Sequence, residues 1–449
     1  MRPPRATRAL SLGVTAAAAF ALAACGDSGG VGGATTASQA PTTSNEPVTL
    51  KYWTWFPAET SLKKVIDAYQ KDHPNVTIEL KEFEAADYQK QLPLALNGGE
   101  SLDIVGVQVS AMTNTVNTQL RPVTEWESSL PEGWRDQLEA KPLEQAQKIS
   151  KDGVLYDIPL GSIGSAAMYY NPAILDKAGV TVPGTLQELV DAAKKIKASD
   201  PSIQPVVFAG DGWWQEEMLF TIAGQTNPTL SDDILYGDTG WNDPAMVDAL
   251  AAYKELFTSG AVDKATLSLM SPRPTEEFTK GKAAFYLDGS WQNSLLSKSY
   301  REANKINLAD VGATGLPVIR PNGKQSMRAF AEGGLAIPKS SKNVAAAADF
   351  IGYLAFGDGV QHWAPDLVLS PSKKGYVPGD DVLASAAAKD GFTVVATLIN
   401  NAGSNRDSNQ DFLGNVEGNA ILDVLNGKNS PQEAADEMQK QWTSGRYPH

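Results

Sequence analysis

The chain has 449 residues, too many for one ordinary domain and enough for two that each bury a core of their own. Hydrophobic residues make up 42% of it and charged residues 20%, which is typical of globular proteins. The formal net charge is −14. Because such an acidic surface repels phosphate backbones, we expect no nucleic acid among the partners.

The N-terminus has the pattern of a secretory signal. Three arginines within the first eight residues form a basic head, and the apolar run 9–22 that follows is too short to span a bilayer as a stable helix. The only cysteine, Cys25, comes soon afterwards, so no disulfide can form within the chain. We therefore expect a signal peptide over residues 1–24.

The stretch "LAAC" at 22–25 resembles the lipobox of bacterial lipoproteins, in which the peptide is cut before the cysteine and the thiol is lipidated. The alternative, a buried structural Cys25, is less favoured because no periodic apolar segment surrounds it. Residues 25–47 hold mainly Gly, Ser, Thr, Ala and Pro after the cysteine, and cannot bury enough surface to offset their ordering entropy. We expect a lipidated Cys25 with a flexible tether, anchored on the extracellular face of the bacterial cell membrane.

From residue 48 the chain alternates strand and helix patterns. Apolar and polar residues alternate over 48–56, which predicts a strand. The spacing of apolar side chains over 59–73 predicts a helix, which ends before a proline. Further strands are expected over 75–80 and 102–107.

Helix starts recur at residues whose side chains can cap a helix N-terminus, several of them followed by proline or by a glutamate three residues on. Glycines stand where two of these helices should end. The expected caps are Asn171, Thr185, Asp243 and Ser430, and the expected stops are Gly179 and Gly260. Strands that alternate with helices of this length predict an α/β fold with mainly parallel sheets.

Eight stretches, which together span nearly all of residues 48–449, follow one another in the order that one known family has. They are "LKYWTWF" with the helix to "AYQKDHPNVTI", "LPLALNGGESLDIVGV", "KDGVLYDIPLG", "MYYNPAILDKAGVTVPGTLQELVDAAKKI", "FTKGKAAFYLDGSW", "GLPV", "EGGLAIPKSSKNVAAAADFIGYL" and "SPQEAADEMQKQW". In this order they resemble the extracellular solute-binding proteins of ABC transporters, in the carbohydrate-binding group that includes maltose-binding protein. Eight such stretches in the same order are specific for the family, but they are not specific for a ligand.

This resemblance implies a two-lobe, periplasmic-binding-protein-like α/β fold, with a ligand cleft between lobes that are joined by hinge segments. Lobe one is expected over 48–160 and 332–380, and lobe two over 161–331 and 381–449. The chain is expected to cross between the lobes near 158–162, 330–333 and 370–381. The resemblance also implies a monomeric binding protein, not an enzyme, that uses no cofactor or metal. Its partners would be a small-molecule carbohydrate and the permease subunits of an ABC transporter.

Aromatic residues are the first candidates for a sugar site, because flat rings cover the C–H faces of pyranoses while polar groups take the hydroxyls. Trp213 and Trp214 in "AGDGWWQEE", and Trp291 in "LDGSWQN", stand where strands are expected to end. Trp291 matches the position at which an aromatic residue of the family commonly stacks on sugar; alternatively, it covers the core of lobe two. One residue of the adjacent pair should contact ligand and the other pack inside, because neighbours on an extended segment face opposite ways.

Polar candidates occupy comparable positions. Gln108 follows an expected strand, and Glu59 begins the first helix, where an acid also favours the helix N-terminus. Asp288 and Glu332 lie at expected strand ends, where solvated or capping carboxylates are the alternative. Gly333 would let backbone amides approach a ligand closely. The expected ligand-binding residues, of which the last two rest on family topology, are Trp55, Glu59, Gln108, Trp213, Trp214, Asp288, Trp291, Glu332, Gly333, Trp363 and Arg406.

Other classes of protein stay open on sequence alone. Aromatic subsites with paired carboxylates also describe a glycoside hydrolase, in which Asp288 and Glu332 could be the pair if their separation suits. Neighbouring tyrosines bind iron in proteins of related fold, and the chain has Tyr169-Tyr170. The three histidines show no zinc-like spacing.

The expected ligand is a neutral oligosaccharide, with a non-sugar solute as the alternative. Several aromatic faces suit more than one ring, and the acidic surface disfavours an acidic sugar unless Arg328 or Arg406 counters it. Asp103 is expected to be structural, in a turn or a helix cap. The remaining tryptophans are expected to pack in the core or on the surface: Trp53, Trp126, Trp134, Trp241 and Trp442.

Overall fold

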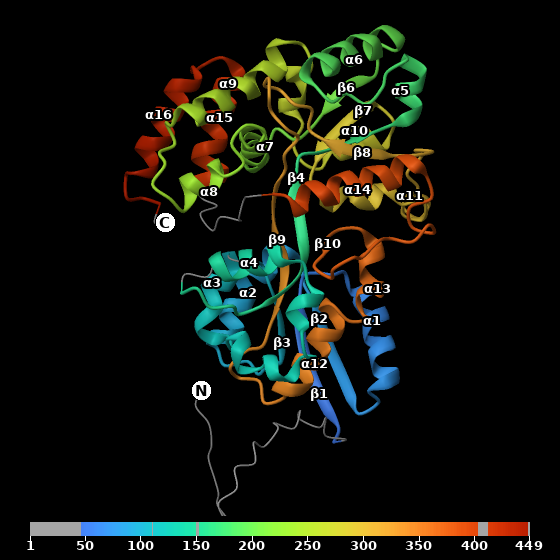
Figure 1. The fold of residues 1–449 in the computed structure, drawn as a ribbon, viewed down its shortest axis with the longest axis vertical. Helices are drawn as coiled ribbons and strands as arrows, with labels where there is room; N and C mark the ends of the chain where they lie inside the picture. The colour runs from blue at the N-terminus through green and yellow to red at the C-terminus, as the bar shows by residue number, and fades with distance from the viewer. Residues whose placement is uncertain (1–45, 110, 150–151, 403–411, 448–449) are drawn as a thin grey trace, which may run out of the picture. The chain divides into compact units, whose positions relative to one another are not determined.

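The computed structural model describes residues 46–109, 111–149, 152–402 and 412–447 (Figure 1). The expected signal peptide, residues 25–45 of the expected tether with Cys25, and Arg406 lie outside the described residues. Within the described residues, no helix is both long and apolar enough to cross a membrane.

The described strands form two sheets. One sheet has six strands in the order β10-β4-β9-β3-β1-β2, and the other has four in the order β6-β7-β5-β8. We call the part built on the six-stranded sheet lobe one and the part built on the four-stranded sheet lobe two. The strands are β1 (Val48–Thr54), β2 (Val76–Glu82), β3 (Ile104–Val107), β4 (Ile158–Ser165), β5 (Ala167–Tyr170), β6 (Gln204–Val207), β7 (Ala283–Asp288), β8 (Gly312–Gly315), β9 (Arg328–Ala336) and β10 (Ser370–Pro371).

Helices cover both sheets (Figure 1). The α-helices are α1 (Glu59–Asp72), α2 (Ala85–Asn97), α3 (Ala111–Val116), α4 (Ala140–Ile149), α5 (Pro172–Ala178), α6 (Leu186–Ser199), α7 (Gly212–Gly224), α8 (Leu230–Leu235), α9 (Pro244–Thr258), α10 (Arg273–Thr279), α11 (Lys298–Ala303), α12 (Val344–Ala355), α13 (Val360–Trp363), α14 (Ala386–Asn400), α15 (Gly418–Asn426) and α16 (Pro431–Trp442). The 3₁₀ segments are η1 (Asn117–Gln119), η2 (Val123–Glu125), η3 (Glu127–Ser129), η4 (Trp134–Gln137), η5 (Lys264–Ser268), η6 (Ser290–Leu296) and η7 (Ala364–Asp366), and η8 (Phe412–Glu417) is a π-helix.

The expected helix caps are confirmed. The side chains of Asn171 and Asp243 accept a hydrogen bond from the backbone N–H two residues on, which starts α5 and α9. Thr185 and Ser430 form capping boxes at the starts of α6 and α16. The two expected glycine stops have positive φ, which glycine adopts at no steric cost: Gly179 at 62° and Gly260 at 82°.

The expectation of mainly parallel sheets is wrong. Three strand pairings are parallel, namely β1–β2, β1–β3 and β6–β7. The other five pairings are antiparallel, and the longest runs between β4 and β9. The sequence could not show this, because an alternating pattern predicts a strand without its direction.

The neighbouring strands β4 and β9 lie where the chain passes from one sheet to the other (Figure 1). A single residue, Ala166, separates the end of β4 in lobe one from the start of β5 in lobe two. Ala166 is buried and has a φ of 64°, a region that residues other than glycine rarely adopt. Strand β10 pairs with β4 on its other side. The three segments expected to cross between the lobes therefore contain strands that lie next to one another.

Each lobe buries an apolar core of its own. In lobe one, Tyr52 of β1 packs with Leu62 of α1 and Phe350 of α12. In lobe two, Trp214 of α7 and Tyr253 of α9 belong to the main cluster. Two cores of this size agree with the chain length, which allowed two domains.

The tryptophans expected to pack do so. Trp53 is half-buried, with its ring centroid 4.9 Å from that of Phe83 and the Lys81 ammonium 4.3 Å above its face. The other four are buried: Trp126, Trp134, Trp241 and Trp442.

Asp103 is structural, as expected, and ties the start of β3 to two other segments. Its buried carboxylate accepts the backbone N–H of Lys51 at 3.0 Å and the hydroxyl of Ser341 at 2.7 Å. The Asn343 amide donates to the same carboxylate at 3.2 Å. Asp103 therefore holds β1 and the residues before α12 together, so its hydrogen bonds are made inside lobe one.

Candidate functional site

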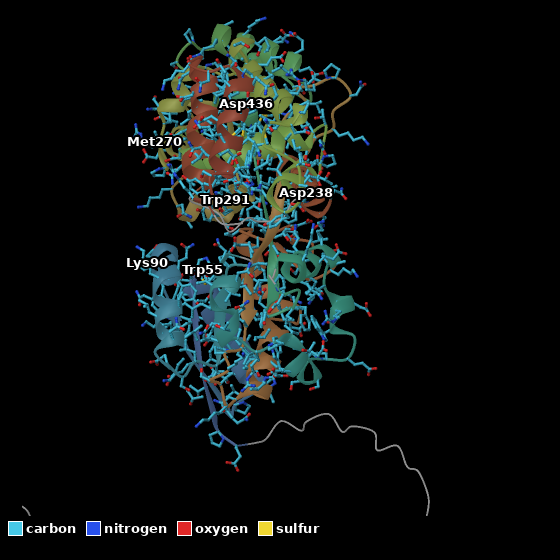
Figure 2. All side chains as sticks on the ribbon, turned by 90° about the vertical axis from the view of Figure 1, so that its left-hand side faces the viewer. Trp55, Lys90, Asp238, Met270, Trp291 and Asp436 are labelled. Carbon is cyan, nitrogen blue, oxygen red and sulfur yellow. The ribbon has the colours of Figure 1, made fainter. Side chains whose placement is uncertain are left out.

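Trp291 lies between the two lobes. It follows β7 in the short helix η6 and is half-buried. Its side chain packs against the core of lobe one and also against the core of lobe two, and among the described residues it is the one partly buried hydrophobic residue to do so. Figure 2 labels Trp291, and Trp55, which belongs to lobe one. Trp291 therefore does more than cover the core of lobe two.

Trp213 and Trp214 form an aromatic cluster with Trp291. They occupy the first turn of α7, and not the extended segment that was expected. Trp213 is 40% exposed and Trp214 is 1% exposed, because a helix turns successive side chains by about 100°. The Trp291 centroid lies 6.4 Å from the centroid of each of the other two rings. Of the adjacent pair, Trp213 presents a face to solvent and Trp214 packs inside.

Asp288 ends β7, directly before the turn that carries Trp291. The backbone N–H of Gly289 donates to its Oδ1 at 2.8 Å, and the amide of Gln292 donates to its Oδ2 at 3.0 Å. The Tyr286 hydroxyl donates to the same Oδ2. Burial raises the pKa of Asp288 above its usual value, against the opposing effect of hydrogen bonds from these groups and from Trp291. The oxygens of Asp288 are thus engaged within lobe two.

The lobe-one candidates follow the carboxyl ends of β1 and β3. Trp55 is half-buried, with its ring centroid 5.3 Å from that of Tyr88. Gln108 is half-buried just after β3, and its carbonyl accepts the N–H of Met112 at 3.1 Å. Glu59 is exposed in the first turn of α1, with an ion pair to Lys63, four residues on, at 2.6 Å. The position of Glu59 suits a helix N-terminus as well as a ligand site.

The candidates on β9 and in α13 differ in their surroundings. Glu332 is 8% exposed on β9, and its Oε1 accepts the N–H of Gly333 at 3.2 Å. Gly333 has a φ of 64°, which explains the glycine there. Trp363 is 2% exposed, and its indole N–H donates to the carbonyl of Leu354 at 3.0 Å. The structure therefore does not bring Trp363 to the candidate site, because its ring and its polar atom are used in the core of lobe one.

The structure also places two residues that belonged to the alternatives left open by the sequence. Arg328, considered as a counter-charge for an acidic sugar, is 2% exposed at the start of β9 and contacts the carboxylate of Glu216 of α7. Tyr169, considered as an iron ligand, is fully buried, and its hydroxyl donates to the Asn293 side chain at 2.8 Å. Among the described residues there is no group of three or more His, Cys, Asp or Glu that could hold a metal ion.

Gly289 belongs to this site but was not among the residues expected from the sequence. A Cβ atom built on Gly289 would overlap carbon atoms of the six-membered ring of Trp291. The backbone there is extended, with φ −80° and ψ 169°, which any residue adopts. The glycine two positions before the tryptophan was visible in the sequence, but only the structure shows that the ring folds back over it.

A cavity of about 610 Å³ lies elsewhere in lobe one, between the end of α1 and the start of α12. It opens beside Val48, where β1 begins, whereas Trp55 follows the end of that strand. Some of the polar side chains that line it already contact one another. The Tyr69 hydroxyl donates to the Asp349 carboxylate at 2.6 Å, and the ring centroids of His73 and Tyr69 are stacked 4.0 Å apart. No candidate ligand residue belongs to the described lining of this cavity.

Two α/β lobes, joined by neighbouring strands and sharing an aromatic residue, define a two-lobe binding protein of the periplasmic type, with its ligand cleft between the lobes. The sequence profile of the bacterial extracellular solute-binding proteins matches residues 55–359, more than half of the chain. The protein belongs to that family, which captures solutes for ABC transporters and consists of binding proteins, not enzymes.

Individual relatives agree with this assignment. An uncharacterised ABC transporter extracellular-binding protein of Pyrococcus horikoshii is 24% identical over 317 residues, which is 66% of this chain and 69% of the relative. A structure from a study of xylan utilisation by Caldanaerobius polysaccharolyticus has a TM-score of 0.69 and 22% identity, and covers 88% of this chain and all of its own. The GacH receptor of Streptomyces glaucescens, solved unliganded and with acarbose, has a TM-score of 0.67 and 20% identity over 89% of this chain and 99% of its own.

A third solved structure is a cyclo/maltodextrin-binding protein in complex with maltotetraose. It has a TM-score of 0.68 and 19% identity, and covers 91% of this chain and all of its own. At these identities the similarities to solved structures show the fold alone.

Proposed function

We propose that this protein captures a neutral oligosaccharide between its lobes by hinge closure and delivers it to the permease of an ABC transporter. The contact of Trp291 with the cores of both lobes carries the proposal, because an aromatic face at that junction suits a pyranose ring held between the lobes. The names of the similar structures, which mention xylan utilisation, acarbose and maltotetraose, support a carbohydrate.

In the proposed site, aromatic faces cover the sugar and polar groups orient it. Trp291 and the exposed Trp213 provide stacking faces from lobe two, and Trp55 provides one from lobe one. The polar contacts come from the proposed set of Glu59, Gln108, Glu332, Gly333 and Arg406. Trp214, Asp288 and Trp363 support neighbouring residues from inside, since their surfaces are engaged within the lobes.

The proposed division of the chain places lobe one at 48–160 and 332–380 and lobe two at 161–331 and 381–449. The antiparallel pair of β4 and β9 and the single residue between β4 and β5 support a hinge there. Closure around a ligand is the motion known for periplasmic binding proteins. Only a ligand that favours the closed state can shift the equilibrium toward it.

The proposed location is the outer face of the cell membrane, to which lipid on Cys25 attaches a monomeric protein through its tether. The basic head, the short apolar run and the "LAAC" stretch support this, together with membership of an extracellular family. A single acyl chain binds membranes only marginally, so stable anchoring needs more than one chain on the cysteine.

A screen of ligands by thermal unfolding tests the proposal. A ligand at about one hundred times its Kd stabilises the folded state by about 2.7 kcal/mol, which raises the melting temperature measurably. We expect a rise with one series of neutral oligosaccharides and none with polyamines, peptides or metal chelates. If the melting temperature rose with one of those non-sugar solutes and with no sugar, that solute and not a carbohydrate would be the ligand.

A further inference from the structure

We infer that Gly289 and Asp288 are positioning residues, which fix the ring of Trp291 beside Trp213 and so set the affinity for sugar without touching it. The inference rests on the proposed function for its effect on binding. Its structural part, the orientation of one indole ring, can be tested without any ligand.

Gly289 provides the space that the Trp291 ring occupies. Carbon atoms Cε3, Cζ3 and Cη2 of the ring lie where a Cβ on residue 289 would stand. The backbone at 289 is in an ordinary extended conformation, so alanine would fit the chain there. The glycine is therefore required by the ring alone, and any side chain at 289 must push the indole away.

Asp288 closes the turn that presents the ring. Its two oxygens accept hydrogen bonds from the Gly289 N–H, the Gln292 amide and the Tyr286 hydroxyl, which draws both ends of the turn toward β7. The Trp291 side chain also acts to lower the pKa of Asp288, although burial outweighs it. A carboxylate engaged in this way has little capacity left for a sugar hydroxyl.

The same turn is bonded to neighbouring strands. The Tyr169 hydroxyl of β5 lies between two acceptors and shares its proton with the Gly289 carbonyl at 3.0 Å and the Asn293 side-chain oxygen at 2.8 Å. The N–H of Gly164, on the strand β4 that joins the lobes, donates to the Ser290 hydroxyl at 3.0 Å, and Ser290 is fully buried. The ring is thus held relative to β4, so its orientation is coupled to the segment about which the lobes would move.

A ring fixed in this way needs no ordering when a sugar arrives, and that favours binding. Gly289→Ala should displace the ring and weaken sugar affinity at least about tenfold, the scale of losing one stacking contact. The matched control is Gly184→Ala, also in lobe two, where the nearest atom to a new Cβ is 3.5 Å away, an ordinary contact, and φ is not positive.

The experiment combines near-UV circular dichroism of the ligand-free protein with calorimetric titration of sugar. Gly289→Ala should change the tryptophan signal and weaken binding, whereas Gly184→Ala should change neither. In a Trp291→Ala background, Gly289→Ala should have no further effect on affinity, because no ring remains to be displaced. An unchanged signal and affinity, or an equal loss of affinity in both backgrounds, would overturn the inference.

Asp288→Asn provides an independent arm if Gly289→Ala does not fold. It should also change the tryptophan signal, whereas Asp238→Asn, an exposed site in lobe two labelled in Figure 2, should not. Equal signals from both variants would count against the role of Asp288. If the wild-type protein binds no sugar, the proposed function fails, and the dichroism arm alone then decides whether these residues fix the ring.

Discussion

Arg328, the first residue of β9, and Glu216 of α7 form a buried ion pair, with 2% and 4% of their side chains exposed. The guanidinium also lies 4.9 Å from the ring centroid of Phe220. Removing one partner leaves the other charge buried, so Arg328→Ala should lower the free energy of unfolding by about 3 to 5 kcal/mol. Urea unfolding measures the loss.

The matched control for that variant is Arg273→Ala, because Arg273 pairs with Glu276 at 2.9 Å while 58% of its side chain is exposed. Surface pairs contribute little to stability. Similar losses from the two variants would contradict the structural role of the buried pair.

The adjacent tryptophans of α7 should respond in opposite ways to truncation. Trp213→Ala should weaken sugar binding and leave the melting temperature near that of the wild type, because 40% of Trp213 is exposed. Trp214→Ala should cost about 3 to 5 kcal/mol of stability, because it empties a core position. Calorimetry measures the sugar affinity of both variants, and urea unfolding measures their stability. Lost affinity in Trp214→Ala together with lost stability in Trp213→Ala would show that Trp214 is the residue facing the ligand.

Asp157, directly before β4, should make stability depend on pH. It is 1% exposed, the Thr113 hydroxyl donates to its Oδ2 at 2.9 Å, and burial raises its pKa from 3.8 to about 7. The folded protein therefore holds this proton more tightly than the unfolded chain does. The resulting stabilisation is complete below about pH 4 and is lost as the pH rises to about 7, by on the order of 4 kcal/mol.

Asp157→Asn cannot titrate, so its unfolding free energy should fall less than that of the wild type between about pH 4 and pH 7. Urea unfolding at several pH values in that window gives the slope of unfolding free energy against pH for the wild type and for the variant. Parallel slopes would mean that Asp157 does not titrate with a raised pKa.

Cys25→Ser should release the protein from membranes and leave its affinity in solution unchanged, because the lipid and the sugar site occupy separate parts of the chain. Fractionation of expressing bacterial cells measures the release, and titration of the soluble fraction measures the affinity. Membrane association that persists in the variant would argue against lipidation of this cysteine.

The helix caps were predictable because they depend on neighbouring residues. Thr185 and Glu188, three residues apart, specify a capping box wherever the helix lies in the fold. The α7 start was not predicted, since Asp211 at its N-cap makes no side-chain hydrogen bond to the helix among those described. The segment with Trp213 and Trp214 was therefore expected to be extended, although it is helical.

The finer parts of the site depend on contacts distant in sequence, which no local pattern records. Trp363 was expected at the site because of its place in the family order, but its N–H bonds to Leu354 within the core of lobe one. Strand direction was equally hidden, since β4 and β9 are far apart in the chain and their alternation fits either direction.

Carbohydrate binding is tested most directly by calorimetric titration of the purified wild-type protein with xylo-, malto-, cello- and galacto-oligosaccharides, with the monosaccharides and a polyol as comparisons. We expect a Kd of about 1 μM or tighter for one oligosaccharide series, which corresponds to a binding free energy of about −8 kcal/mol or more negative. Absence of heat with every sugar, from protein shown to be folded, would contradict the proposal that the cleft holds a carbohydrate.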